Sequence, residues 1–281
     1  MKRRSGKSRK IADWTVRALS SLAALIGIVF LVWILYEVTI RGAKALSPDF
    51  FFKLPTPPGI PGGGVANAIL GTLVIIIMAA LIGVPTGILA GVYLSEFGQE
   101  TRFGAYVRFA NNVMMGVPSI IVGLFVYTLL VLSTGHFSAY AGAVALAIIM
   151  LPVIARTTED MLQLVPNGLR EAALAIGSPR WKATFSVIFR AAKSGLITGV
   201  LLAMARVSGE TAPLLFTAMN GPYWPRSLTQ PTPNLTVTIF NYAMSPYRDW
   251  QQTAWGAALV IMAAVLALNI FTRLSLREAK K

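Results

Sequence analysis

The chain has 281 residues, of which 55% are hydrophobic and only 13% are charged, a composition that excludes an ordinary soluble domain. Long apolar runs recur along it, so the sequence predicts an all-α integral membrane protein with several spans. The net charge of +14 does not indicate a nucleic-acid partner, because the basic residues lie at the ends of apolar runs and form no aromatic-lined groove. The absence of cysteine excludes thiol catalysis and cysteine-ligated metals, and the single histidine, His136, lies in a short connection where we expect no ligand role.

Six apolar runs are the expected transmembrane helices. They cover residues 18–40, 66–94, 107–132, 139–155, 195–216 and 253–271. The first run is longer than the roughly 7–15 apolar residues of a cleaved signal peptide, so it is expected to be retained although Ala43-Lys44-Ala45 has the small-x-small form of a cleavage site. Residues 41–65, rich in proline and glycine, are expected to form a non-helical periplasmic loop that leads into one membrane domain at 66–275.

The distribution of Lys and Arg predicts the orientation in the membrane. If the N-terminus is cytoplasmic, nineteen of the 25 basic residues lie on the cytoplasmic side, five lie outside, and Arg206 lies within a span. Both termini, as basic tails at 1–17 and 276–281, are therefore predicted to be cytoplasmic. The long loop from Asn220 to Trp250 is then external, where it could receive a partner or cover the bundle.

Each of the four middle spans contains a proline, whereas the first and last spans contain none. These residues are Pro85, Pro118, Pro152 and Pro213. A proline inside a membrane helix frees backbone groups that neighbours or water must satisfy, which favours helices that border a cavity. The alternative is that the prolines reflect only the ordinary composition of membrane helices.

Two charged residues, Arg206 and Glu210, lie in the middle of the fifth expected span. Each charge opposes insertion by about 2.5–3.5 kcal/mol, so such residues usually serve a transport pathway. Their i, i+4 spacing would let them pair on a continuous helix. We expect them to face a substrate pathway, with Arg156 at the inner end of the fourth span as a second candidate; the alternative is a structural ion pair.

Residues 167–193 are expected to form a cytoplasmic hairpin of two amphipathic helices, too polar to span the bilayer. Asn167 is predicted to cap the first helix and Gly177 to end it in the left-handed conformation. Ser178-Pro179 is predicted to begin the second helix, with serine as the cap and proline as the first residue.

The hairpin carries Glu171-Ala172-Ala173-x-x-x-Gly177 followed by Val187-Ile188-Phe189, which resembles the "EAA" loop of permease subunits in bacterial ATP-binding-cassette (ABC) importers. It departs from many members in having Phe189-Arg190 where they have Leu-Pro. The segment Arg206-x-x-Gly209-Glu210-Thr211-Ala212-Pro213 is similar to the fifth-helix signature of phosphate permeases. The resemblance covers about residues 66–275.

The resemblance implies the type I importer-permease (MetI-like) fold in a bacterial inner membrane, and a subunit that is not an enzyme. ATP and magnesium would be bound by a partner ATPase dimer, which Glu171, Ala172, Ala173 and Gly177 would contact. A homologous second permease and a periplasmic phosphate-binding protein would complete the importer. Three alternatives stay open: a permease for another oxyanion such as sulfate, molybdate or phosphonate, an ATP-independent anion transporter, and a non-transporting membrane component.

Overall fold

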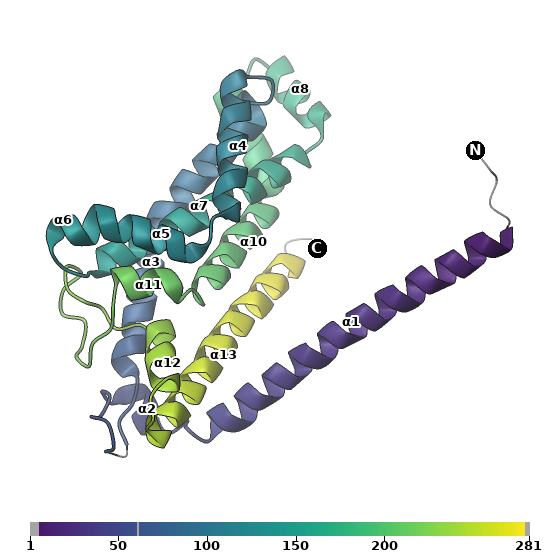
Figure 1. Cartoon of the computed structure of the whole chain (residues 1–281). Helices are drawn as coiled ribbons and strands as arrows, with labels where there is room; N and C mark the ends of the chain where they lie inside the picture. Colours follow the sequence, from purple (N-terminus) through teal and green to yellow (C-terminus); the bar gives the residue numbers. More distant parts are fainter. Residues whose placement is uncertain (1–5, 61, 279–281) are drawn as a thin grey trace.

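Helices form all the regular secondary structure of residues 6–60 and 62–278, which are the residues that the computed structural model describes (Figure 1). Five helical runs are long and apolar enough to cross a membrane, and a sharply bent pair of helices is a sixth candidate. The predicted all-α architecture with six spans agrees with this arrangement. Residues 1–5 and 279–281, which belong to the two expected cytoplasmic tails, lie outside the described residues.

The first span belongs to α1 (Gly6–Ala43), a 38-residue helix that stands away from the rest of the chain except near its C-terminal end (Figure 1). At that end the guanidinium of Arg41 lies over the ring of Trp255, 5.1 Å from its centroid, on α13 (Arg248–Glu278). The expected first and last spans thus lie within longer helices. The apolar side chains along α1 are largely exposed in this single chain, which leaves a surface that lipid or another subunit can cover.

The centre of the bundle is formed by α3 (Ala66–Val92) and α7 (Ala139–Gln163), which pack against each other along most of their lengths. A row of small residues at four-residue intervals on α3 permits the close approach: Gly83, Gly87 and Gly91. A Cβ atom on Gly91 would lie only 2.6 Å from the carbonyl oxygen of Ala155. Both helices extend beyond the apolar runs that predicted them, α7 to Gln163 and α3 through a π-helical turn, η1 (Tyr93–Phe97).

The third expected span, residues 107–132, is not one helix but two that meet at an angle of 102°. The break falls at Val117-Pro118, because proline has no N–H to continue the helix and holds the preceding residue in an extended conformation (φ −71°, ψ 127°). The pieces are α4 (Arg102–Gly116), α5 (Ser119–Val126), the π-helical turn η2 (Tyr127–Val131) and α6 (Leu132–Thr134).

The fifth expected span, residues 195–216, is displaced and interrupted. A helical run extends from Arg180 to Val207, so the second half of the hairpin continues into the span without a break. Residues 208–211 interrupt the helix, and a new one begins at Ala212 with Pro213 as its second residue, where a proline is tolerated because it has no N–H to donate. The segments are α8 (Asn167–Ala175), α9 (Arg180–Ala183), η3 (Thr184–Ile188), α10 (Phe189–Val207) and α11 (Ala212–Thr217).

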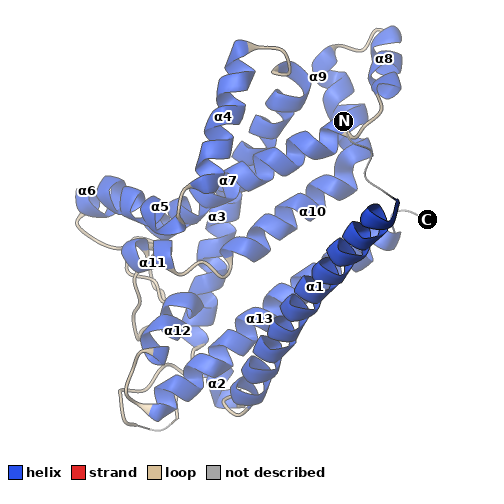
Figure 2. Ribbon diagram, turned by 45° about the vertical axis from the view of Figure 1, so that its right-hand side comes forward, coloured by secondary structure: helices blue, strands red, loops and turns tan. Residues whose placement is uncertain are grey.

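Two short helices lie at the end of the bundle opposite the hairpin, as Figure 2 shows. The loop 41–65 was expected to be non-helical, but it contains α2 (Pro48–Phe52), which begins with a proline and is capped by the Ser47 hydroxyl. The outer loop contains α12 (Leu235–Ala243), capped by the Asn234 side chain, which accepts a hydrogen bond from the Val237 N–H at 3.0 Å.

Candidate functional site

A cavity of about 400 Å³ lies where two helix breaks meet a proline inside α7. The bend between α4 and α5 contributes Val117 and Pro118, α7 contributes Pro152, and the break between α10 and α11 contributes Arg206 and Glu210. The rest of its lining is apolar apart from one hydroxyl: Met114, Met115, Ser119, Ile121, Val122, Phe125, Ile148, Ile149 and Val153. Two charged side chains thus share a largely apolar cavity in the membrane part of the molecule.

Arg206 lies in the last turn of α10, where the unpaired carbonyl groups of the helix end favour a positive charge. The predicted pairing with Glu210 is wrong: among the described residues Arg206 makes no ion pair or hydrogen bond through its guanidinium. The physical reason is that the helix ends at Val207, so the two residues are not one helical turn apart. Arg206 is exposed, and its five N–H donors have no partner in the part of the chain that the structure describes.

Glu210 is held through its backbone rather than through its carboxylate. The hydroxyl of Thr236 on α12 donates to the Glu210 carbonyl oxygen at 3.0 Å, and the Glu210 N–H donates to the Val207 carbonyl at 3.1 Å. The same Thr236 hydroxyl lies 3.0 Å from the Asn234 side-chain oxygen. The break between α10 and α11 is therefore tied to the outer helix α12.

The four prolines do not all border this cavity. Pro118 and Pro152 line it, whereas Pro85 lies inside α3 and is not among the lining residues. Pro213 is buried against α5, where a Cβ on Gly123 would lie 2.6 Å from its Cα. The expected link between prolines and a cavity therefore holds for two of the four.

Arg156 is not brought into the cavity. It lies one turn beyond Pro152 on α7, where its Nε donates to Asp160 at 3.2 Å and its guanidinium is 4.0 Å from Glu159. Because α7 continues past it to Gln163, Arg156 is not at the end of its helix as the sequence suggested. Two carboxylates already surround it, so it is less available to an anion than Arg206.

The motif residues of the hairpin differ in how far they are exposed. Glu171 and Ala172 are exposed, Ala173 is buried, and Gly177 ends the first helix with φ +80°, as predicted. Several large apolar side chains beside them are exposed, which is unusual for a free surface: Leu169 (43%), Ile176 (85%) and Trp181 (62%). This surface suits a protein partner.

The predicted helix starts in the hairpin are shifted by one residue each. Pro166 and Pro179 occupy the N-cap positions, so Asn167 is the first residue of α8 and Ser178 precedes the cap of α9. The Asn167 side chain instead accepts a hydrogen bond from Arg170 at 3.1 Å. Proline is compatible with these positions because it has no N–H that would need a partner there.

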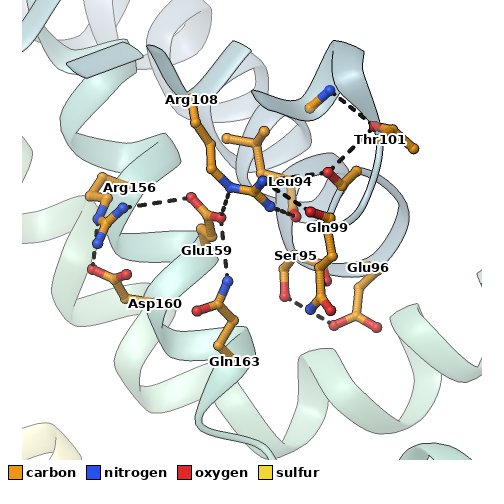
Figure 3. Close-up of polar contacts among 12 residues, drawn as sticks. Leu94, Ser95, Glu96, Gln99, Thr101, Arg108, Arg156, Glu159, Asp160 and Gln163 are labelled. Atoms are coloured by element: carbon orange, nitrogen blue, oxygen red, sulfur yellow. Dashed lines mark hydrogen bonds and ion pairs between the residues drawn. The ribbon is translucent and has the colours of Figure 1, made fainter. Parts of the chain in front are cut away.

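Sequence reasoning missed two largely buried ion pairs at the hairpin end of the bundle, and Figure 3 shows the one between Arg108 and Glu159. Arg108 donates to Glu159 at 2.6 Å, and Arg170 donates to Glu96 at 2.9 Å. The partners in the second pair are 74 residues apart in the chain, and no local spacing marks them. The only available signal was the concentration of opposite charges at the inner ends of the expected spans.

At the outer end a cavity of about 630 Å³ lies between the loop after α2, α12 and the start of α13. Asn67 on α3 is buried and donates to the carbonyl oxygens of Gly221 and Tyr223, so the outer loop is tied to the bundle that it covers. The rings of Tyr242 and Trp250 stack with centroids 4.3 Å apart, and burial raises the pKa of the Tyr242 hydroxyl.

Residues 83–280 match the protein family described as "Binding-protein-dependent transport system inner membrane component". The chain belongs to this permease family. The permease is 46% identical over 262 residues to the "Phosphate transport system permease protein PstA" of Yersinia pestis, with 93% of this chain and 89% of that protein covered. It is 47% identical over 272 residues to the protein of the same description from Haemophilus influenzae, with 97% and 96% covered.

Solved structures support the fold. The permease matches a chain of the inward-facing MetNI methionine ABC transporter with a TM-score of 0.61 and 20% identity over 76% of this chain and 94% of that one. It matches a chain of a bacterial ABC transporter involved in alginate import with a TM-score of 0.66 and 13% identity, over 98% of this chain and 99% of that one. The MetI-like importer-permease fold is thus confirmed, and the chain is a multi-pass inner-membrane subunit of an ABC transporter rather than its ATPase.

Proposed function

We propose that this permease forms half of the translocation pathway of an ATP-driven importer of inorganic phosphate, and that Arg206 is the transient contact for the anion. The observation that carries the proposal is an arginine that has no carboxylate partner among the described residues and lies in a largely apolar cavity bordered by two helix breaks. The relatives from Yersinia pestis and Haemophilus influenzae, which are phosphate transport system permeases, support the choice of anion.

Phosphate transport requires both a cation and an energy source. Phosphate carries one to two negative charges near neutral pH, and moving it toward a negative interior costs about 2.3 kcal/mol per charge per 100 mV. Guanidinium can bind two phosphate oxygens at once, and it binds more strongly where water is excluded. Glu210 lines the same cavity, so its negative charge would keep phosphate binding weak enough for release.

Arg156 is the second pathway residue in this proposal, on the cytoplasmic side of the cavity. Its carboxylate neighbours, Asp160 at 3.2 Å and Glu159 at 4.0 Å, would compete with the anion there. Because of this competition, we expect phosphate to contact Arg156 briefly during release and not to stay bound there. The side chain is 46% exposed, so it can move between these partners and a passing anion.

The subunit would work in a complex with an ATPase and a binding protein. We propose a homologous permease (PstC) as the other half of the pathway, a PstB ATPase dimer on the hairpin at 167–193, and the periplasmic phosphate-binding protein PstS on the outer end. The exposed apolar side of α1 supports a second permease as its partner. Glu171, Ala172, Ala173 and Gly177, with the exposed apolar side chains beside them, would form the ATPase contact, and this chain would bind no ATP, magnesium or other cofactor itself.

Arg206→Gln in the purified, reconstituted complex tests this proposal. Loss of charge-assisted hydrogen bonds worth about 1.5–3 kcal/mol should lower phosphate uptake about 10- to 100-fold while the complex still assembles. Arg226→Gln, which removes an exposed arginine from the outer loop, is the matched control and should leave uptake unchanged. Normal uptake by Arg206→Gln would remove Arg206 from the pathway, and stronger competition by sulfate or molybdate than by phosphate would reassign the substrate.

A further inference from the structure

The first helix of the hairpin contacts the membrane bundle through the largely buried side chain of Arg170. Helix α8 packs mainly on the other half of the hairpin, α9 and η3. From α8, Arg170 donates to the backbone carbonyl oxygens of Leu162 and Val165 at 2.6 and 2.5 Å, at the C-terminal end of α7. Carbonyl groups at a helix end have no partner within the helix, so this arginine satisfies them.

The same guanidinium also binds the cytoplasmic end of α3. Its Nε and one terminal nitrogen lie 3.2 and 2.9 Å from the two carboxylate oxygens of Glu96, on the π-helical turn η1. The side chains are only 18% and 8% exposed, so the pair is largely shielded from water. A two-bond arginine–carboxylate contact fixes direction as well as distance, so a movement of α8 must displace η1.

A second arginine, Arg108 on α4, also binds η1 (Figure 3). Arg108 of α4 donates to the Leu94 carbonyl oxygen at 2.7 Å and to the Glu159 carboxylate at 2.6 Å. The side chain of Glu159 is 3% exposed, so this ion pair joins α4 to α7 in the interior. The segment η1 is therefore held between the hairpin and α4 by two arginines.

Helix α4 then extends from this cluster to the substrate cavity. Its C-terminal residues Met114 and Met115 line that cavity, and the bend at Val117-Pro118 follows directly. Halfway along α4, the buried Asn111 side chain donates to the Pro152 carbonyl oxygen at 3.2 Å. One unbroken helix thus joins the η1 cluster to the cavity wall.

We propose that Arg170 and Arg108 are positioning residues that transmit movement of the coupling hairpin through η1 and α4 to the wall of the Arg206 cavity. This inference rests on the proposed function of the hairpin and the cavity. The two arginines do not touch the substrate; they make opening and closing of the cavity follow the ATPase. Without these arginines, the ATPase would hydrolyse ATP but the cavity would not open and close with it.

The test is the amount of phosphate imported per ATP hydrolysed by the reconstituted complex. Arg170→Gln combined with Glu96→Gln removes both charges together, so no unpaired buried charge remains. We expect at least a tenfold fall in phosphate per ATP, with ATPase activity within twofold of the unmodified complex. Lys53→Gln with Asp49→Asn, which neutralises an exposed ion pair on α2, is the matched control and should keep the ratio. A ratio within twofold of the unmodified complex in the Arg170/Glu96 variant overturns the proposal.

Glu96→Asp provides a second test if the double variant does not assemble. The shorter side chain keeps the charge but cannot hold both contacts to Arg170, so the ratio should fall at least threefold in an assembled complex. An unchanged ratio here also overturns the proposal, because a merely structural contact would lower the yield and leave the ratio as it was. If the unmodified complex hydrolysed ATP without importing phosphate, the proposed function would fail instead.

Discussion

Arg108, Arg156 and Arg170 each lie within ion-pair distance of a carboxylate, whereas Arg206 has none among the residues that the structure describes. The difference separates two uses of the same side chain. A buried arginine with its carboxylate and carbonyl partners in place is held in one position, and replacing one partner leaves a charge without compensation. An arginine without such partners keeps its donors for a ligand.

The pairing pattern could not be predicted from spacing. Arg206 and Glu210 have the i, i+4 separation that favours an ion pair on a helix, but the helix ends between them. Arg170 and Glu96 are far apart in the sequence, yet they form a two-bond contact because the Arg170 side chain reaches from α8 to the π-helical turn η1 after α3. Long-range pairs depend on the tertiary fold, which local patterns do not contain.

Glu171→Lys tests the hairpin at the scale of one residue. Glu171 is exposed, so the change should leave the fold of the permease intact while it places a positive charge in the proposed ATPase contact. We expect at least a tenfold loss of ATPase retained on the tagged permease, measured by co-purification and ATP hydrolysis. Glu100→Lys makes the same charge change at another exposed cytoplasmic position and should retain the ATPase. Full retention and transport in Glu171→Lys would contradict the assignment of the hairpin.

At the scale of elements, the sequence located the spans but not their interruptions. Pro85 and Pro152 remain inside α3 and α7, whereas Pro118 and Pro213 mark the start of new helices. A sequence pattern treats the four alike. The distinction follows from packing, because α5 and α11, the two helices that follow the breaks, lie against each other, with Gly123 admitting Pro213. The contact between α5 and α11 thus stabilises both breaks.

Gly91→Val tests the close contact between α3 and α7. A Cβ at Gly91 would lie 2.5 Å from the Thr158 Cβ and 2.6 Å from a backbone carbonyl oxygen, so the helices must separate. Overpacking of this kind costs about 1–3 kcal/mol, and we expect a lower thermal unfolding midpoint of the detergent-purified permease. Gly27→Val on α1 is the control, because a Cβ there meets nothing within 4 Å in the chain. An equal midpoint for both variants would show that the contact does not stabilise the bundle.

At the scale of the whole molecule, the hairpin lies at one end of the bundle and α2 and α12 lie at the other (Figure 2). This polarity agrees with the predicted charge distribution, in which the basic residues concentrate on the side of the hairpin. The general architecture was predictable because apolar runs and basic flanks are both readable in the sequence. The cavity was not, since it requires the bend at Pro118 and the break before Pro213 to meet.

The absence of cysteine from the chain allows a direct test of orientation. Lys182→Cys places one exposed thiol on the hairpin, and Gln230→Cys places one on the outer loop. Because basic segments remain in the cytoplasm, a membrane-impermeant maleimide applied to intact spheroplasts should label Gln230→Cys but not Lys182→Cys. After permeabilisation both should react, while the unmodified chain stays unlabelled. Labelling of Lys182→Cys in intact spheroplasts would reverse the orientation, and the hairpin could then not contact a cytoplasmic ATPase.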